Sequence, residues 1–305
     1  MNELFLQLVR LGIGHSAKFQ PTTVKWAAIK ALAEKHGLSA VVLDGVEEVR
    51  CKKAEGRCDI NMPSQGLMLQ WIGEVLQEYE GRYKAYEKTI GEMAEFYNLN
   101  GYKMMVLKGY ACSHDWPKPN HRPCGDIDIW LFGHQESADA LLESSKVQGV
   151  QKFKIDKSHH HHTTFCWGDF LVENHYDFIN THRHYSHRGL EQIFKEFGQD
   201  DSHFVEVNGE KVYLPSPNLH ALFLVRHALN HFTSIGINLR QLLDWAFFAE
   251  KHTNEIDWKW LTGMLEKYHM MDFYNCLNAI CVEDLGFESQ IFHGSCNKFI
   301  SIHRR

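Results

Sequence analysis

Residues 122–131, with the sequence RPCGDIDIWL, place two carboxylates two positions apart within an apolar run. Side chains on a β-strand alternate between its two faces. We therefore expect Asp126 and Asp128 on one face, and the isoleucines that follow them on the other, against a core. Two neighbouring carboxylates repel each other unless a cation lies between them, and hard divalent cations prefer oxygen ligands. The stretch predicts a strand that binds a divalent metal ion.

Upstream of this stretch lies Val106-Leu107-Lys108-Gly109, an apolar segment that ends in a lysine and a glycine. Glycine after a strand lets the chain turn into a helix, whose free N–H groups can bind a phosphate. Lysine adds a positive charge for the outer phosphates. Alone, this dipeptide is typical of an ordinary turn, and it gains significance from the paired aspartates. Lys108 and Gly109 are candidate nucleotide ligands on that ground.

A third acid is expected near the first two, because two carboxylates hold a metal only loosely. Residues 171–178, LVENHYDF, alternate so that Glu173, His175 and Asp177 share one face. Glu173 is our preferred third ligand and Asp177 the alternative, although the periodicity alone does not choose between them.

Histidine is unusually frequent, with 21 residues, and four of them are consecutive, at positions 159–162. Imidazoles bind transition metals. Four successive residues of a strand cannot all face one ion, however, and no cysteine is spaced to complete a zinc site. We interpret the run as the polar start of a strand, with one or two histidines that support the metal ligands.

Two polar pairs are expected on helices near the C-terminal end, His227 with His231 and Arg240 with Asp244. Each pair is spaced by four residues and so shares a helix face. A polar network between helices and a contact with a nucleotide or an acceptor explain this pattern equally well.

The pattern of apolar residues predicts an α+β fold with a small mixed sheet. Strands are expected at 103–107, 126–132, 161–167, 170–178 and 211–214, with a hairpin turn at Gly168-Asp169. Helices are expected at 21–36, 67–98, 137–145, 217–232, 239–251, 257–268 and 272–283. The helix at 67–98 is expected as one helix or a broken pair, with a core stripe of Trp71, Val75, Tyr79, Tyr83, Tyr86 and Ile90. We predict an N-terminal helical region (1–100), a catalytic core (101–188) and a C-terminal helical region (189–305).

Composition limits the classes of function. The chain has 305 residues, 44% of them hydrophobic, which suffices for a sizeable core. Its formal net charge of −6 argues against general affinity for nucleic-acid backbones. We find neither a basic segment followed by an apolar one at the start nor an apolar run of ~20 residues, and we therefore expect a cytoplasmic protein without membrane contact.

Together these motifs resemble the DNA polymerase beta-like nucleotidyltransferase superfamily and, within it, a bacterial family of uncharacterised nucleotidyltransferases. The resemblance covers most of residues 65–250, including the helices between 215 and 244. Its most specific segments are Leu107-Lys108-Gly109, His121-Arg122-Pro123, Asp126-Ile127-Asp128 and Glu173-Asn174-His175. The wider superfamily usually has Gly-Ser or Gly-Gly in place of Lys108-Gly109 and a shorter gap before the acids, which leaves the construction of the phosphate loop open.

The resemblance implies a two-metal nucleotidyl transfer from a nucleoside triphosphate. The resemblance implies that Asp126, Asp128 and Glu173 are the catalytic ligands of Mg²⁺ or Mn²⁺. On this ground we choose Glu173 over Asp177 as the third acid. On this reading Asp128→Asn leaves the fold intact and removes catalysis. Contacts with the nucleotide are expected from Lys108, Gly109, Arg122 and Arg240. His175 and Asp244 are expected to support the metal ligands or the nucleotide contacts.

The acceptor, the base and the oligomeric state are not determined by the sequence. A small molecule or a protein is the preferred acceptor over long nucleic acid. Two alternatives are a non-catalytic nucleotide-binding module of the toxin–antitoxin type and a metal-dependent hydrolase that uses histidines and carboxylates.

Overall fold

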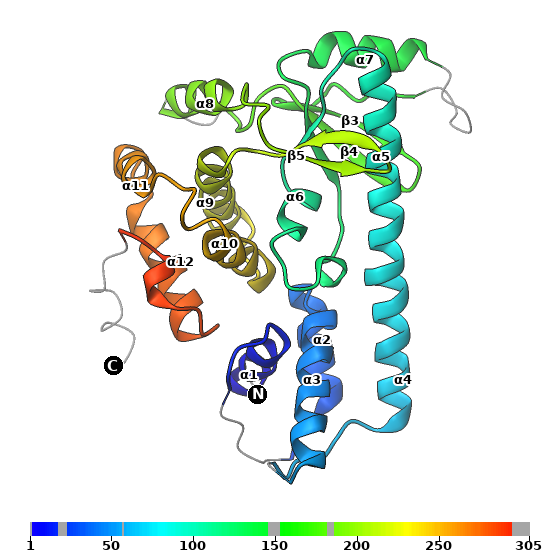
Figure 1. The fold of residues 1–305 in the computed structure, drawn as a ribbon, viewed down its shortest axis with the longest axis vertical. Coiled ribbons are helices and arrows are strands. Elements are labelled where there is room, and N and C mark those ends of the chain that lie inside the picture. Colours follow the sequence, from blue (N-terminus) through cyan, green and yellow to red (C-terminus); the bar gives the residue numbers. More distant parts are fainter. Residues whose placement is uncertain (1, 18–22, 57, 146–152, 182–185, 295–305) are drawn as a thin grey trace. The chain divides into compact units, whose positions relative to one another are not determined.

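The computed structural model describes residues 2–17, 23–56, 58–145, 153–181 and 186–294 (Figure 1). The fold is α+β, as predicted, with one six-stranded mixed sheet in the described residues. The chain divides into two compact units, which we describe separately. The helical unit comprises Met1–Gly81, Asp115–Pro123 and Leu224–Arg305, and the sheet unit comprises Arg82–His114 and Cys124–Phe223. The three consecutive regions expected from the sequence stay a prediction.

The sheet has the strand order β3-β4-β2-β1-β6-β5. Its strands are β1 (Met105–Val106), β2 (Ile127–Trp130), β3 (His162–Trp167), β4 (Phe170–His175), β5 (Phe204–Val207) and β6 (Glu210–Tyr213). Strand β2 runs parallel to β4, and β1 runs antiparallel to β2 and parallel to β6. Strands β3 and β4 form the predicted hairpin, since Trp167 pairs with Phe170 across Gly168-Asp169.

Strand β5 was not predicted. It lies at the edge of the sheet, and within it only Val207 is buried, so it lacks the apolar alternation that marks a strand. The neighbouring strand β6 was expected at 211–214 and is found one residue earlier.

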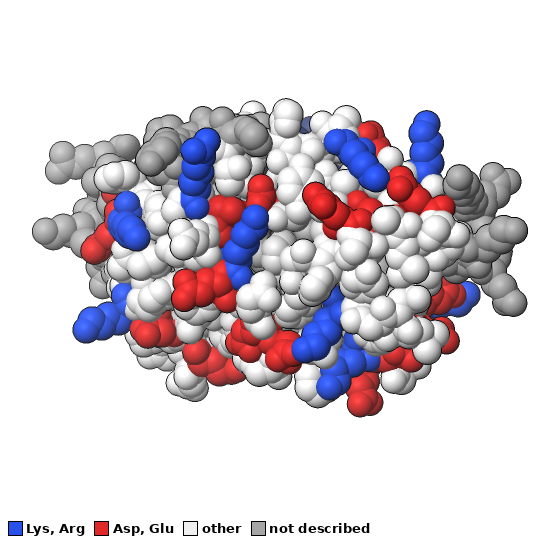
Figure 2. All heavy atoms as spheres, turned by 90° about the horizontal axis from the view of Figure 1, so that it is seen from above, with Lys and Arg blue, Asp and Glu red and all other residues white. Residues whose placement is uncertain are grey.

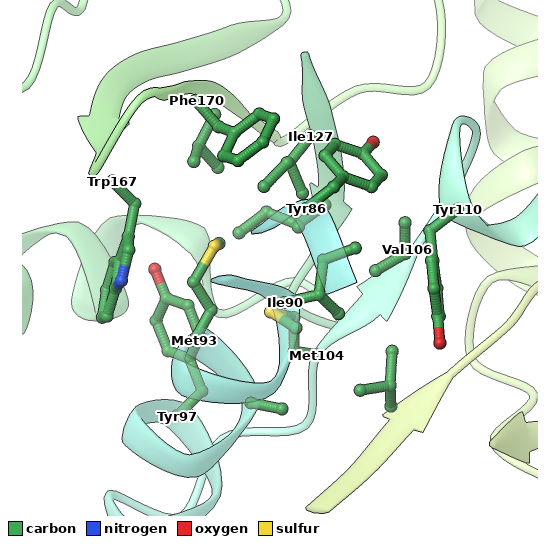
Figure 3. Close-up of a cluster of buried hydrophobic side chains, with 14 of the residues drawn as sticks. Tyr86, Ile90, Met93, Tyr97, Met104, Val106, Tyr110, Ile127, Trp167 and Phe170 are labelled. Carbon is green, nitrogen blue, oxygen red and sulfur yellow. The ribbon is translucent and has the colours of Figure 1, made fainter. Parts of the chain in front are cut away.

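One face of the sheet is covered by helices of the same unit, α5 (Arg82–Leu99) and α7 (Gln135–Ser144). Figure 3 shows Tyr86, Ile90 and Tyr97 of α5 packed against the sheet residues Val106 and Ile127. The prediction that the isoleucines of β2 face a core is confirmed, since both are fully buried. The unit also contains α6 (Tyr110–Ser113), α8 (Ser186–Phe197) and the start of α9 (Pro217–Ser234).

The helix expected at 67–98 proves to be a chain of three helical segments. They are α4 (Gln65–Glu74), the π-helical η1 (Val75–Gly81) and α5. Ser64 caps α4 by accepting a hydrogen bond from the amide of Leu67. Every member of the predicted apolar stripe is buried, which confirms its assignment to the core.

The other helices described in the helical unit include five that were predicted individually, at 21–36, 217–232, 239–251, 257–268 and 272–283, and four that were not. They are α1 (Asn2–Gly12), α2 (Trp26–His36), α3 (Ser39–Ala54), η2 (Pro119–His121), the end of α9, α10 (Leu239–Lys251), α11 (Trp258–Lys267), α12 (Met271–Glu283) and η3 (Ser289–Ile291). Helix α2 ends at Gly37 in the left-handed conformation, as expected, but begins at Trp26; the expected start at 21–22 lies outside the described residues. Helix α10 has the predicted bounds and begins with a capping box of Asn238 and Gln241. None of the helices described is both long and apolar enough to cross a bilayer.

Candidate metal and nucleotide site

Strand register brings the predicted acidic residues together on the face of the sheet opposite α5. Asp128 of β2 pairs with Glu173 of β4, and Thr164 of β3 pairs with Glu173 from the other side. His175 pairs in the same way with His162 of β3. Because paired positions in neighbouring strands point to the same face, these five polar side chains form one cluster. The ligand atoms of Asp128, Glu173 and His175 all lie within 4.8 Å of one another.

Asp128 is the centre of this cluster and is almost completely buried, with 2% of its surface exposed. Lys108 Nζ lies 2.7 Å from its Oδ1 atom, and His175 Nε2 lies 3.1 Å from the same oxygen. His175 Nε2 is also 3.5 Å from Glu173 Oε2. Two cationic groups therefore converge on two carboxylates, and Lys108 contacts a carboxylate directly.

The hydrogen bonds of His175 indicate that its imidazole is protonated. Nε2 faces the carboxylate of Asp128, and Nδ1 lies 3.2 Å from the backbone carbonyl of Asp177. Both partners only accept hydrogen bonds, so both ring nitrogens must donate. Burial alone would lower the pKa of His175, but the hydrogen bonds to Asp128 and Glu173 outweigh it and raise the pKa to about 9.

The same contacts keep the buried acids ionised. Burial would raise the pKa of Asp128, but Lys108 and His175 hold it far below its ordinary value. Burial likewise opposes ionisation of Glu173, and the hydrogen bond from His175 still leaves its pKa below the ordinary value. Burial would lower the pKa of Lys108, but the charge of Asp128 raises it. At neutral pH Asp128, Glu173, Lys108 and His175 are therefore all charged, and these four residues are the charged cluster.

Asp126 lies immediately before β2, rather than in the strand, and is exposed to solvent. The surrounding protein, and then the charge of Asp128, raise the pKa of its carboxyl group, whereas Lys108 lowers it. Glu173 also acts on it electrostatically. Asp126 is therefore close enough to Asp128, Lys108 and Glu173 to feel their charges, and it is exposed to solvent.

Asp177, the alternative third acid, is placed differently. Strand β4 ends at His175, so Asp177 does not continue the alternation of the strand. Its carboxylate pairs with Lys195 of α8. Register therefore places Glu173, and not Asp177, beside Asp128.

The remaining predicted residues, Arg122, Arg240 and Asp244, belong to the helical unit. Arg122 and Asp244 form a buried bidentate ion pair. Arg122 Nε donates to Asp244 Oδ1 at 2.7 Å, and Arg122 Nη2 donates to Asp244 Oδ2 at 2.9 Å. Trp116 Nε1 donates to the same carboxylate at 2.9 Å. Arg240 is a half-buried residue of α10. A role of these three residues in nucleotide binding stays a prediction.

A buried polar network, which the sequence did not suggest, holds β4 from its other face. Asn174, between Glu173 and His175, donates to Asp139 Oδ1 at 2.8 Å, and Thr163 donates to Oδ2 at 2.8 Å. Asp139 lies on α7, so the network ties β3 and β4 to that helix. It fixes the strand that carries two members of the charged cluster.

Gly109 is required by its backbone conformation and by a close neighbour. Its φ of +57° is unfavourable for other residues, and a Cβ atom there would lie 2.3 Å from Tyr86 Oη. That hydroxyl donates a 2.8 Å hydrogen bond to the backbone carbonyl of Asp126. The sequence predicted Tyr86 only as a member of the apolar core stripe. The spacing of apolar residues does not indicate that its hydroxyl binds the backbone of Asp126. Gly109 therefore makes room for the hydrogen bond that anchors Asp126; its predicted contact with phosphate stays a prediction.

We expect Gly109→Ala to destabilise the protein more than Gly168→Ala. Both glycines have a φ of +57°, but nothing lies within 4 Å of a Cβ atom at Gly168. Gly168→Ala thus reports the strain of a positive φ without a clash, about 1–3 kcal/mol. Gly109→Ala adds the clash with Tyr86 and an alanine at a ψ of −98°, outside the left-handed helical region. Urea unfolding measures the difference. Adding Tyr86→Phe to Gly109→Ala removes the clashing hydroxyl and should recover part of the loss. Equal losses in the two alanine variants would show that the close approach of Tyr86 is unimportant.

The run of four histidines separates into two exposed and two inward residues. His159 and His160 are exposed, whereas His162 is 6% exposed and His161 is half-buried. Burial lowers the pKa of both inward histidines to about 4, so their rings are neutral at pH 7. The predicted polar start of a strand is correct for this segment.

Comparisons with known proteins identify the family of the chain. The sequence profile of a family described as "Uncharacterised nucleotidyltransferase" matches residues 22–285. Among solved structures, an antigenic nucleotidyltransferase-like protein from Paracoccidioides brasiliensis matches with a TM-score of 0.36 and 16% sequence identity. That match covers 54% of this chain and 75% of the other. No curated protein matches the chain.

Proposed function

Because the chain belongs to the family of uncharacterised nucleotidyltransferases, we propose that it transfers a nucleoside monophosphate from a nucleoside triphosphate to a hydroxyl group with Mg²⁺ as cofactor. In this reaction the acceptor oxygen forms a bond to the α-phosphorus, the bond to the bridging oxygen breaks, and pyrophosphate leaves. The hydroxyl proton passes to solvent or to a carboxylate. The observation that carries the proposal is the register pairing of Asp128 with Glu173 beside Asp126 and Lys108.

The residues fit a site for hard divalent cations. Asp126, Asp128 and Glu173 supply carboxylate oxygens, which are the ligands that Mg²⁺ prefers. Asp128 is held ionised although it is buried, and Asp126 faces solvent, where a metal–nucleotide complex would enter. When bound, Mg²⁺ supplies charge stabilisation for the attacking and leaving oxygens.

Lys108 and His175 have separate parts in this proposal. Lys108 is partly exposed, with 19% of its side chain accessible, and its ammonium group would bind the phosphates of the nucleotide. His175 is fully enclosed and donates to Asp128, and it lies within reach of Glu173. It would orient these two ligands, as hydrogen-bonded groups behind metal ligands commonly do.

A small molecule or a protein is the acceptor that the charge distribution favours. The net charge is −6, and acidic and basic side chains are intermixed on the face shown in Figure 2. Nucleic-acid backbones bind to continuous basic surfaces. A non-catalytic nucleotide-binding module is the alternative function, and the presence of all three acids favours the enzyme.

We expect one nucleoside triphosphate to raise the midpoint of thermal unfolding in the presence of Mg²⁺. A ligand that binds only the native state adds about 2.7 kcal/mol of stability at a hundred times its Kd. ATP, CTP, GTP and UTP are each compared with and without Mg²⁺, and the effective nucleotide is then tested for pyrophosphate release with candidate acceptors. A shift without pyrophosphate release would favour the non-catalytic module. The absence of any Mg²⁺-dependent shift would contradict the proposed site.

A further inference from the structure

We propose that His161, His162 and His175, with Glu173, form a second metal site, which selects a transition-metal ion of the Zn²⁺ class. The site lies beside the carboxylates proposed for Mg²⁺ and shares Glu173 with them. Neither Asp126 nor Asp128 belongs to it, and its existence does not require the chain to transfer nucleotides. His175 would join it by releasing the proton that its Nε2 atom donates to Asp128, so Zn²⁺ would replace that hydrogen bond.

The three imidazoles converge in space. One ring nitrogen from each of them lies within 4.8 Å of one from each of the others. The ring centroids are 4.3 Å apart for His161 and His162, 5.2 Å for His162 and His175, and 5.8 Å for His161 and His175. The sequence predicted that the four consecutive histidines do not all face one point, and two of them meet His175 here. His161 can lie beside His162 because it precedes β3, outside the alternation of the strand.

The backbone holds these residues in place before any metal binds. His162 and His175 occupy directly opposed positions in the antiparallel pair β3–β4. The carbonyl oxygen of His161 accepts hydrogen bonds from the amides of Tyr176 and Asp177, both at 3.1 Å. The cluster is thus fixed by the hairpin and by the residues that follow it, and a metal would not have to order a loose segment.

Two of the ring nitrogens have no other function in the described residues. The Nδ1 atoms of His161 and His162 are buried and lack a hydrogen-bond partner there. His162 is more than nine-tenths buried, so solvent does not readily replace such a partner. Buried polar atoms without partners are rare in native proteins, and a bound ion is one of the recognised explanations.

Glu173 would provide the fourth ligand, and it lies near two of the three histidines. Its Oε2 atom lies 3.8 Å from His162 Nδ1 and 3.5 Å from His175 Nε2. A tetrahedral site with zinc–ligand bonds near 2.0–2.1 Å has ligand-to-ligand separations of about 3.4 Å. These two separations would shorten by a few tenths of an ångström on binding, which side-chain rotation permits.

The donor atoms determine the metal. Imidazole nitrogens favour Zn²⁺ and its neighbours in the transition series, whereas carboxylate and water oxygens favour Mg²⁺. Three imidazoles and one carboxylate therefore select against Mg²⁺. Asp126 and Asp128 remain for the harder ion, so the two sites differ in the metals that they prefer.

The test is a Zn²⁺ titration of the full chain after removal of metals with a chelator. We expect one Zn²⁺ per wild-type chain, measured by competition with a chromophoric chelator. His161→Gln and His162→Gln should each weaken binding by about 100-fold or more, since supporting groups behind a ligand already account for 10–100-fold. His160→Gln is the matched control, because His160 belongs to the same run but is exposed. Co²⁺ replaces Zn²⁺ in a second experiment, in which the absorption spectrum reports tetrahedral nitrogen ligation.

Thermal unfolding without metal shows whether each variant is folded, and a variant that is not folded is replaced by the corresponding asparagine substitution. The proposal is overturned if the wild-type chain does not bind Zn²⁺ stoichiometrically, or if His161→Gln and His162→Gln bind it as His160→Gln does. Asp126→Asn separates this result from the proposed function. It should bind Zn²⁺ normally and lose the Mg²⁺-dependent response to nucleotide. Loss of Zn²⁺ binding in Asp126→Asn would assign the ion to the carboxylates and refute the histidine site.

Discussion

Asp126→Asn is expected to abolish nucleotidyl transfer while the free energy of unfolding stays unchanged or rises slightly. Asp126 is exposed and makes no ion pair at close range in the described residues. The surrounding protein and the charge of Asp128 raise the pKa of its carboxyl group, so the native state disfavours its negative charge. Asparagine removes that charge, and with it one of the three oxygen ligands proposed for the metal.

The measurement is pyrophosphate release with the nucleotide that gives the thermal shift, combined with urea unfolding of the same preparation. We expect a loss of at least about 100-fold in the rate, the scale found for groups that support a metal ligand. Asp169→Asn is the matched control, because Asp169 is also exposed and lies in the β3–β4 turn, outside the charged cluster. Full activity of Asp126→Asn would remove this residue from the site. A large loss of stability would assign it a structural role instead.

Asp128→Asn is expected to destabilise the protein severely, by about 3–5 kcal/mol. Asp128 is the buried counter-ion of Lys108 and of the protonated His175. Asparagine would leave the buried His175 and the partly exposed Lys108 facing a neutral group. The sequence suggested this substitution as a test that leaves the fold intact, but the burial of Asp128 changes that expectation. Loss of activity in Asp128→Asn would therefore not separate catalysis from folding, and Asp126→Asn is the sharper probe.

Lys108→Met should cost less than Asp128→Asn, because His175 still pairs with Asp128 when the lysine is gone. The double variant should be more stable than the sum of the single losses predicts, since Asp128→Asn strands the charge of Lys108 and the double change removes that charge. Urea unfolding at pH 7 measures all three variants. Lys195→Met is the control: Lys195 pairs with Asp177 at the surface, and such pairs contribute about 1 kcal/mol or less. Strict additivity of Lys108→Met and Asp128→Asn would show that the pair is not coupled.

Several elements could be predicted because their signals are local. Alternation around Asp128 predicted a strand with its isoleucines in the core, and β2 has that arrangement. Gly168-Asp169 predicted the hairpin, and the bounds of α10 followed from its apolar spacing. The edge strand β5 escaped notice because its side chains are largely exposed and do not alternate.

The composition of the site depended more on tertiary structure. Alternation allowed Glu173 or Asp177, and the parallel pairing of β4 with β2 placed Glu173 beside Asp128. Arg122 was a candidate for the triphosphate, whereas the structure shows its guanidinium in a buried pair with Asp244. The hydroxyl of Tyr86 binds the backbone of Asp126, and no sequence pattern indicates that contact.

By itself, the sequence determined which residues carry charge, where most of the strands and the strongly periodic helices form, and which face of these elements is apolar. These properties follow from steric preferences and side-chain chemistry over a few neighbouring residues. Only the tertiary structure decided that Lys108 neutralises Asp128, that Glu173 lies directly opposite Asp128, and that His161 and His162 turn inward beside His175. Strand order and register bring together residues that are tens of positions apart in the sequence. The free energy of those pairings comes from burial and charge across strands, and local periodicity does not encode it.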